Sequence, residues 1–178
     1  MRKAIIAGAS AILLAAIASF AGGARMKITS SAFQQAANIP SKFSCDGPNT
    51  SPPLQISDVP AEAKSVVLIV DDPDTQSGLF THWAIWNIPA TVTKIPQGTK
   101  ALMGDLANAK QSGNYLSPCA QSLMGGQDDQ YEFTIYALPT ATLTVSGTSV
   151  ANVLTALKAI SPKPPTATLH GHSGLKGQ

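Results

Sequence analysis

The feature that most constrains the fold is the segment 65–70 (Ser-Val-Val-Leu-Ile-Val), in which Ser65 is followed by an uninterrupted run of aliphatic, mostly β-branched residues. A short continuous apolar run bounded by turn residues is typical of a strand buried on both faces. The run stops at Asp71-Asp72-Pro73-Asp74, because Pro73 lacks a backbone donor and pushes Asp72 out of the helical region. The sequence therefore predicts a buried strand that ends at a cluster of carboxylates.

The rest of the pattern is mostly that of further strands. Alternation of apolar and polar residues predicts strands over 81–88 and 131–138, and weaker signals predict short strands over 26–33, 143–145 and 166–169. Turn residues predict loops over 38–53 and 97–126. One amphipathic helix is predicted over 150–160, with Thr148 or Ser149 as its cap and Pro162 as its end. We expect one mainly β domain with one late helix and a frayed tail from about residue 171.

The N-terminus has the layout of a secretory signal peptide. Arg2 and Lys3 precede an uncharged Ala/Ile/Leu-rich stretch over residues 4–20, and small residues allow cleavage near Ala21 or Ala24. The alternative is an uncleaved anchor helix, for which the apolar stretch is short. We expect residues 1–21 to be removed, residues 22–178 to form a single domain without a stable membrane span, and the protein to be periplasmic or secreted.

Charge excludes two classes of protein. Only 12% of residues are charged, which argues against a charge-extended disordered chain. The net charge of +2 equals the contribution of Arg2 and Lys3, so the rest of the chain is balanced and has no basic stripe. Nucleic-acid binding is therefore not expected.

The two cysteines, Cys45 and Cys119, do not belong to a Cys-x-x-Cys pair. Export would permit a disulfide between them. The alternative is two buried free thiols, and the residues alone leave both open.

The densest candidate for chemistry is the carboxylate group Asp71, Asp72 and Asp74 followed by His82. Carboxylates and an imidazole at a strand end could bind a metal ion, perform acid–base chemistry or bind a polar ligand. The structural alternative is a turn in which Asp side chains accept backbone N–H bonds. Spacing alone does not separate these possibilities.

Sharper enzyme motifs fail on inspection. Gly171-His172-Ser173 begins like a nucleophile elbow, but Leu175 replaces the final glycine and no helix can follow. Pro118-Cys119 begins like a zinc-deaminase motif, but Ser122 replaces its second cysteine. We therefore expect no metal site, no cofactor and no enzymatic activity, with a hydrolase that uses Asp72 and His82 as the remaining enzyme alternative.

Taken together, several segments resemble the phosphatidylethanolamine-binding protein family, and in particular its bacterial Raf-kinase-inhibitor-like branch, also called YbhB/YbcL. The resemblance covers about residues 28–171. It rests on these segments in order: Cys45-Asp46-Gly47, Ser51-Pro52-Pro53-Leu54, Asp71-Asp72-Pro73-Asp74, His82-Trp83, Asn87-Ile88-Pro89 and residues 131–138.

The resemblance implies a central antiparallel sheet packed against a smaller sheet, and a small anion pocket at one end. Asp72 and His82 match the family's pocket aspartate and histidine. Asp129 falls where the family has a second histidine, followed by Gln130 for its arginine and by Tyr131 for its tyrosine. The pocket rim corresponds to residues 117–121, including Pro118. In this layout a Cys45–Cys119 bridge would join two loops at the pocket, and we predict that bridge.

The departures from the family pattern predict a change of ligand. Asp129 is an acceptor where the family has a possible cation, and another carboxylate near Asp72 would repel a phosphate. Gln130 removes a fixed positive charge. We expect a preference shifted from phosphate toward neutral or amine-bearing ligands.

The resemblance implies an exported, non-catalytic protein that binds a small phosphate- or head-group-like ligand near Asp72 and His82, with Pro118, Asp129 and Tyr131 in the site. The alternative is a protein-interaction module, an inhibitor or modulator of another protein, with a degenerate pocket.

Overall fold

The computed structural model describes residues 25–75, 78–119 and 129–173. The predicted signal peptide therefore lies outside the described residues. The elements are β1 (Lys27–Ser30), β2 (Ala37–Asn38), η1 (Ser41–Phe43), β3 (Leu54–Ser57), β4 (Ser65–Asp72), β5 (Phe80–Pro89), β6 (Lys94–Ile95), η2 (Gly104–Leu106), β7 (Lys110–Gln111), β8 (Asp129–Leu138), α1 (Val150–Lys158) and β9 (Thr166–Ser173). Among helices of these residues, none has the length and apolar character needed to cross a bilayer.

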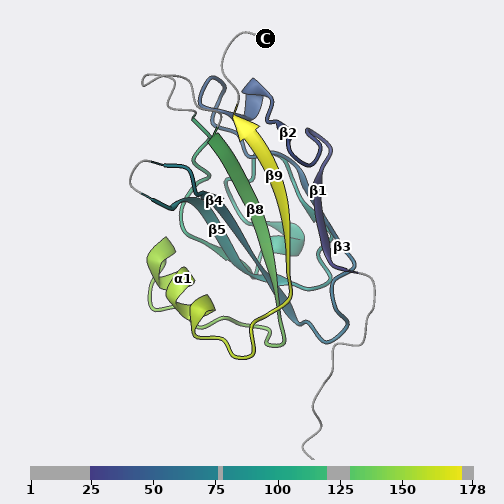
Figure 1. Ribbon diagram of the computed structural model, residues 1–178. Coiled ribbons are helices and arrows are strands. Elements are labelled where there is room, and N and C mark those ends of the chain that lie inside the picture. The colour runs from purple at the N-terminus through teal and green to yellow at the C-terminus, as the bar shows by residue number, and fades with distance from the viewer. Residues whose placement is uncertain (1–24, 76–77, 120–128, 174–178) are drawn as a thin grey trace, which may run out of the picture.

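The strands form two sheets, as predicted. The larger sheet has the order β2-β9-β8-β4-β5-β7, and the smaller has the order β1-β3-β6. All pairings are antiparallel except that of β2 with β9. Strand β4 lies between β8 and β5 (Figure 1), and all eight of its residues are buried. The central buried strand predicted from residues 65–70 is confirmed.

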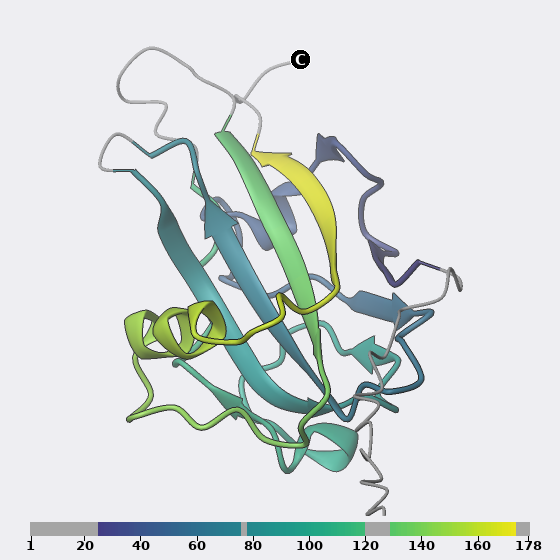
Figure 2. The same ribbon diagram turned by 60° about the horizontal axis from the view of Figure 1, so that its bottom comes forward.

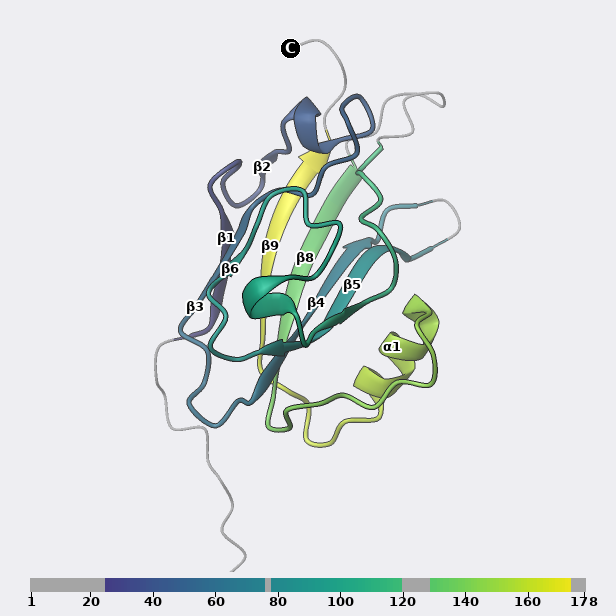
Figure 3. The ribbon, with the colours of Figure 1, turned by 180° about the vertical axis from the view of Figure 1, so that it is seen from behind.

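The two faces of the large sheet are covered by different layers. One face packs on the small sheet through a continuous apolar cluster that includes Ile56, Leu68 and Phe133. The other face carries Val67, Ile69 and Trp86, against which Val153 and Leu157 of α1 pack. Figure 2 shows α1 across this second face, and Figure 3 shows the small sheet from behind, with β1 close to β9. Ser149 caps α1 by accepting a hydrogen bond from the Asn152 N–H at 3.3 Å, so the predicted helix and one of its two predicted caps are confirmed.

Strand β9 corrects the predicted fraying from residue 171. It continues through Ser173, with Gly171 opposite Tyr131 and Ser173 opposite Asp129. A Cβ on Gly171 would lie 2.7 Å from the Ile39 side chain, so glycine is required there for close packing. A glycine inside a strand often marks such a close approach of another segment.

Several short elements also differ from the prediction. The strand predicted over 26–33 is limited to β1, and residues 143–145 form no strand. Instead, the Leu143 N–H donates to Asn87 Oδ1 at 2.7 Å. The loops predicted over 38–53 and 97–126 contain the short elements β2, η1, η2 and β7, while β3 was not predicted.

Candidate functional site

The site begins where β4 ends. Asp72, the last residue of β4, accepts a hydrogen bond on Oδ1 from the Asp74 N–H at 2.9 Å, and Asp74 Oδ2 accepts one from the Gln130 N–H at 3.0 Å. These are the Asp-to-backbone bonds that the structural alternative predicted. They fix the turn, but they leave Asp72 Oδ2 facing the neighbouring strand β5.

A bulge in β5 brings His82 to the same place. Val70 pairs with Trp83 and Asp71 pairs with Thr81, so His82 is an extra residue in the ladder. A bulge re-aims a side chain that simple alternation would place on the other face. The His82 ring consequently lies 5.3 Å from the Tyr131 ring, on the face of the sheet that packs on the small sheet.

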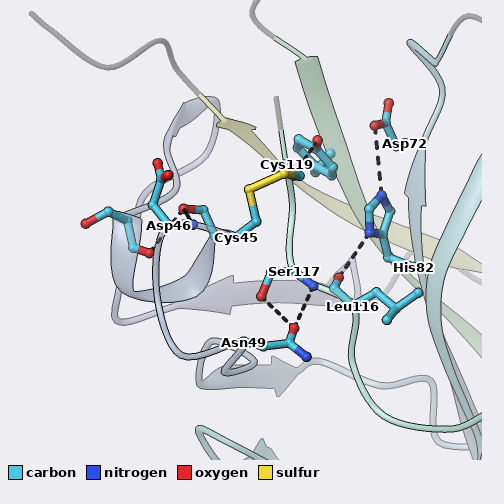
Figure 4. Close-up of a disulfide and its surroundings, with 11 residues drawn as sticks. Cys45, Asp46, Asn49, Asp72, His82, Leu116, Ser117 and Cys119 are labelled. Carbon is cyan, nitrogen blue, oxygen red and sulfur yellow. Dashed lines mark hydrogen bonds and ion pairs between the residues drawn. A yellow bond between two sulfur atoms is a disulfide. The ribbon is translucent and has the colours of Figure 1, made fainter. Parts of the chain in front are cut away.

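The two nitrogens of His82 have different surroundings (Figure 4). Nδ1 lies 3.0 Å from the Leu116 carbonyl oxygen, which can only accept, so Nδ1 carries a proton. Nε2 is buried, has no hydrogen-bond partner among the described residues, and lies 3.9 Å from Asp72 Oδ2, beyond hydrogen-bond distance. Burial lowers the pKa of His82, against smaller opposing effects of the Leu116 carbonyl and Asp72. The imidazole is therefore neutral near pH 7, and Nε2 is an acceptor.

Tyr131 connects this pair to the adjoining loop. Its hydroxyl accepts a hydrogen bond from the Cys119 N–H at 3.1 Å. Burial raises the pKa of Tyr131, and the nearby charges of Asp72 and Asp129 raise it further. Asp129 lies two residues before Tyr131 on β8 and is buried. We refer to Asp72, His82, Asp129 and Tyr131 as the strand-end cluster.

The loop beside the strand-end cluster is held covalently and by hydrogen bonds. Cys45 and Cys119 form a disulfide with a Cα–Cα distance of 5.2 Å, which confirms the predicted bridge. The Cys45 N–H donates to the Pro118 carbonyl at 2.8 Å. Asn49 Oδ1 accepts from both the Ser117 N–H, at 2.9 Å, and the Ser117 hydroxyl, at 2.7 Å (Figure 4). The rim that contains Pro118 is thus fixed next to Tyr131.

The structure brings the predicted site residues together to different degrees. Asp72, His82 and Tyr131 are in direct proximity, Asp129 is close enough to influence Tyr131, and Pro118 lies on the rim. The Gln130 side chain instead contacts His170 Nδ1 on β9. Sequence reasoning missed the contacts of Leu116 and Phe80 with His82, and the bonds by which Asn49 holds Ser117 in the rim. The contacts of Leu116 and Asn49 join segments that are far apart in the sequence, so only the fold reveals them.

The described residues support no metal centre. Among residues 25–75, 78–119 and 129–173, no group of three or more His, Cys, Asp or Glu side chains is arranged to hold a metal ion. The arrangement instead offers a buried polar site with acceptors at its centre and an apolar edge. Phe80 packs edge-on against His82 with ring centroids 4.8 Å apart, and Phe80 and Leu116 are both exposed.

Fold and site define a class of two-sheet β protein with a polar cluster at the ends of its central strands. A sequence model of the family described as phosphatidylethanolamine-binding protein matches residues 29–169. A UPF0098 protein of Methanothermobacter thermautotrophicus is 39% identical over 139 residues, covering 75% of this chain and 89% of that protein. A UPF0098 protein of Chlamydia trachomatis is 36% identical over 137 residues, covering 74% and 89%.

Two solved structures agree with these sequence matches. Escherichia coli YbcL, described as a member of the mammalian PEBP family, superposes with a TM-score of 0.73 at 28% identity, covering 86% of this chain and 100% of YbcL. The putative PEBP homolog CT736 of C. trachomatis superposes with a TM-score of 0.69 at 34% identity, covering 86% and 99%. The chain belongs to the phosphatidylethanolamine-binding protein family, in its YbcL/YbhB-like branch.

Proposed function

We propose that this protein is a non-catalytic binding protein that takes a small polar ligand, of the size of a phosphate or a lipid head group, at the strand-end cluster. The observation that carries the proposal is the unpartnered Nε2 of His82, whose side chain is 9% exposed. A buried polar atom without a partner is costly to a fold, so its presence at a strand end favours a ligand that completes it.

The geometry favours binding over catalysis. A histidine base in nucleophilic catalysis needs a hydroxyl or thiol within hydrogen-bond reach of one nitrogen. Here no residue in the described part of the chain gives Nε2 such a neighbour, and Nδ1 is directed at a backbone carbonyl. Both cysteines are in the disulfide, so neither supplies a nucleophile. The family relationship supports the same view.

Ligand binding is tested by thermal shift and by NMR of the full chain with phosphate, phosphoethanolamine and ethanolamine. At least one of these probes should raise the melting temperature in a saturable way, since a ligand that binds only the folded state stabilises it. His82→Gln should abolish the shift. His170→Gln, which changes a histidine outside the strand-end cluster, should retain it. Equal binding by wild type and His82→Gln would contradict the proposal.

We further propose that the protein is exported and that its signal peptide is removed. The disulfide supports this, because such bonds persist mainly in oxidising compartments. Fractionation of cells that express the full chain, with mass measurement of the product, provides the test. A product that begins near Gly22 or Arg25 in the periplasm or medium is expected, whereas a cytosolic product that retains Met1 would contradict export.

A further inference from the structure

Acidic residues are concentrated around the strand-end cluster. The described residues 71–75, 78–82 and 129–134 contain five of the chain's ten acidic residues and no Lys or Arg. These are Asp71, Asp72, Asp74, Asp129 and Glu132. The first of these groups lies where β4 ends and β5 begins, and the last lies at the start of β8, which pairs with β4. The electrostatic potential at this end of the sheet is therefore negative.

Two atoms at the centre of the cluster, one on His82 and one on Asp72, are acceptors. His82 Nε2 and Asp72 Oδ2 face each other at 3.9 Å, and neither can donate to the other while the imidazole is neutral. A ligand nitrogen about 2.9 Å from both His82 Nε2 and Asp72 Oδ2 could therefore donate a hydrogen bond to each of them. Among the described residues, two backbone donors beside the cluster are already used, because the Cys119 N–H donates to Tyr131 and the Ser117 N–H donates to Asn49.

We infer that the strand-end cluster binds a primary ammonium group, seated between His82 Nε2 and Asp72 Oδ2, in preference to a phosphate. The inference rests on the proposed function and names the part of the ligand that the site recognises. An ammonium supplies three donors and a positive charge, which is what two acceptors in a negative field require. A phosphate would bring further acceptors and negative charge to the same atoms.

The edge of the site selects for an apolar substituent on that amine. Phe80 is 45% exposed and Leu116 is 49% exposed, and both contact His82, one through its ring and the other through its carbonyl. An alkyl chain that leaves the ammonium can cover these side chains. Each methylene buried there should strengthen binding by about two- to fourfold.

The test compares matched probes on the full chain near neutral pH by calorimetry and by the imidazole ¹⁵N signals of His82. The probes are methylamine, butylamine, butyrate and inorganic phosphate, at up to tens of millimolar. We expect butylamine to bind about tenfold or more tightly than butyrate or phosphate, and more tightly than methylamine. The Nε2 signal should move on addition of amine, because that nitrogen gains a donor.

Two isosteric variants test the carboxylates. Asp72→Asn should weaken the binding of butylamine about tenfold or more, while it retains the side-chain oxygen that accepts from the Asp74 N–H. Asp129→Asn should weaken butylamine binding by a smaller factor. Asp58→Asn, directly after β3 of the small sheet, is the matched control and should not change the binding. The fold of each variant is verified by its melting temperature.

The outcomes separate this inference from the proposed function. If phosphate or butyrate binds more tightly than butylamine and His82→Gln abolishes that binding, the ammonium inference is wrong and the binding function stands. If none of the probes binds, both are wrong. Vesicles that present ethanolamine head groups identify the source: binding to both vesicles and butylamine indicates a lipid amine, and binding to butylamine alone indicates a free one.

Discussion

Strand β5 contains two irregularities, and their polar residues have opposite surroundings. At one end Asn87 adopts a positive φ of 60° where the β4–β5 register shifts, and its Oδ1 accepts from the Leu143 N–H at 2.7 Å. At the other end His82 occupies the second shift and leaves Nε2 without a partner. The same backbone device thus serves packing at one end and leaves binding capacity at the other. Hydrogen-bond satisfaction, rather than residue type or burial, distinguishes the two.

The largest expected effect concerns the disulfide, which fixes only the His82 end of this comparison. The double variant Cys45→Ser/Cys119→Ser should lower the free energy of unfolding by about 4 kcal/mol, because the bridge closes a long loop in the unfolded chain. The two cysteines are 74 residues apart. Urea denaturation measures the change. A loss below about 1 kcal/mol would show that the bridge does not restrict the unfolded chain as this account requires.

Asn87→Ala should have the next largest effect, with the free energy of unfolding reduced by about 2 to 3 kcal/mol. The variant leaves the Leu143 N–H unsatisfied and places alanine at a positive φ. Asn87→Gly also loses the bond to Leu143, but glycine tolerates the positive φ. Its free energy of unfolding should therefore lie between those of wild type and Asn87→Ala. Asn108→Ala, at an exposed position, is the control. Denaturation curves provide the values. Ligand binding should be unchanged by all three substitutions. A loss of binding in Asn87→Ala would contradict the assignment of packing to the Asn87 end of β5 and of binding to the His82 end.

His82→Leu should change the free energy of unfolding by less than about 1 kcal/mol, because loss of the bond to Leu116 is offset by removal of an unsatisfied buried atom. It should nevertheless abolish ligand binding. Parallel denaturation and titration measure both effects. A destabilisation as large as that of Asn87→Ala would mean that His82, too, is a structural residue.

The smallest effect is a dependence of stability on pH. The pKa of His82 is lowered from 6.5 in the folded state, mainly by burial, with Asp72 and Tyr131 facing the ring. Below that value the unfolded chain binds a proton that the folded chain does not, so the free energy of unfolding falls as pH decreases, until the folded pKa is passed. Melting temperatures from about pH 7 to about pH 5 should therefore fall less in His82→Gln than in wild type. Identical slopes would exclude this role for His82.

The sequence predicted what depends on local pattern. The apolar run at 65–70, the alternation over 131–138 and the helix with its Ser149 cap were confirmed because burial and capping follow from residue type and spacing. The family resemblance correctly identified the fold class and the disulfide pair.

The remainder depends on pairing between distant segments. A bulge is a mismatch of register between two strands, so His82 alone does not reveal that its side chain joins Asp72 and Tyr131. The two-residue strands β2 and β7 are defined by their pairing with β9 and β5, and two residues are too few to show a strand pattern in the sequence. The tail was predicted to fray from Gly171, because its close neighbours Ile39 and Phe33 lie more than a hundred positions away in the sequence.

The bridge between Cys45 and Cys119 also divides the polypeptide into a covalent ring with two tails. Strands β3, β4, β5, β6 and β7 belong to the ring, whereas β1 and β2 lie on one tail and β8 and β9 on the other. The central pairing of β4 with β8 therefore joins ring to tail. A protease that cuts the turn between β4 and β5, where Leu79 is 59% exposed, would open the ring without releasing a fragment. The nicked protein would remain one molecule until it was reduced.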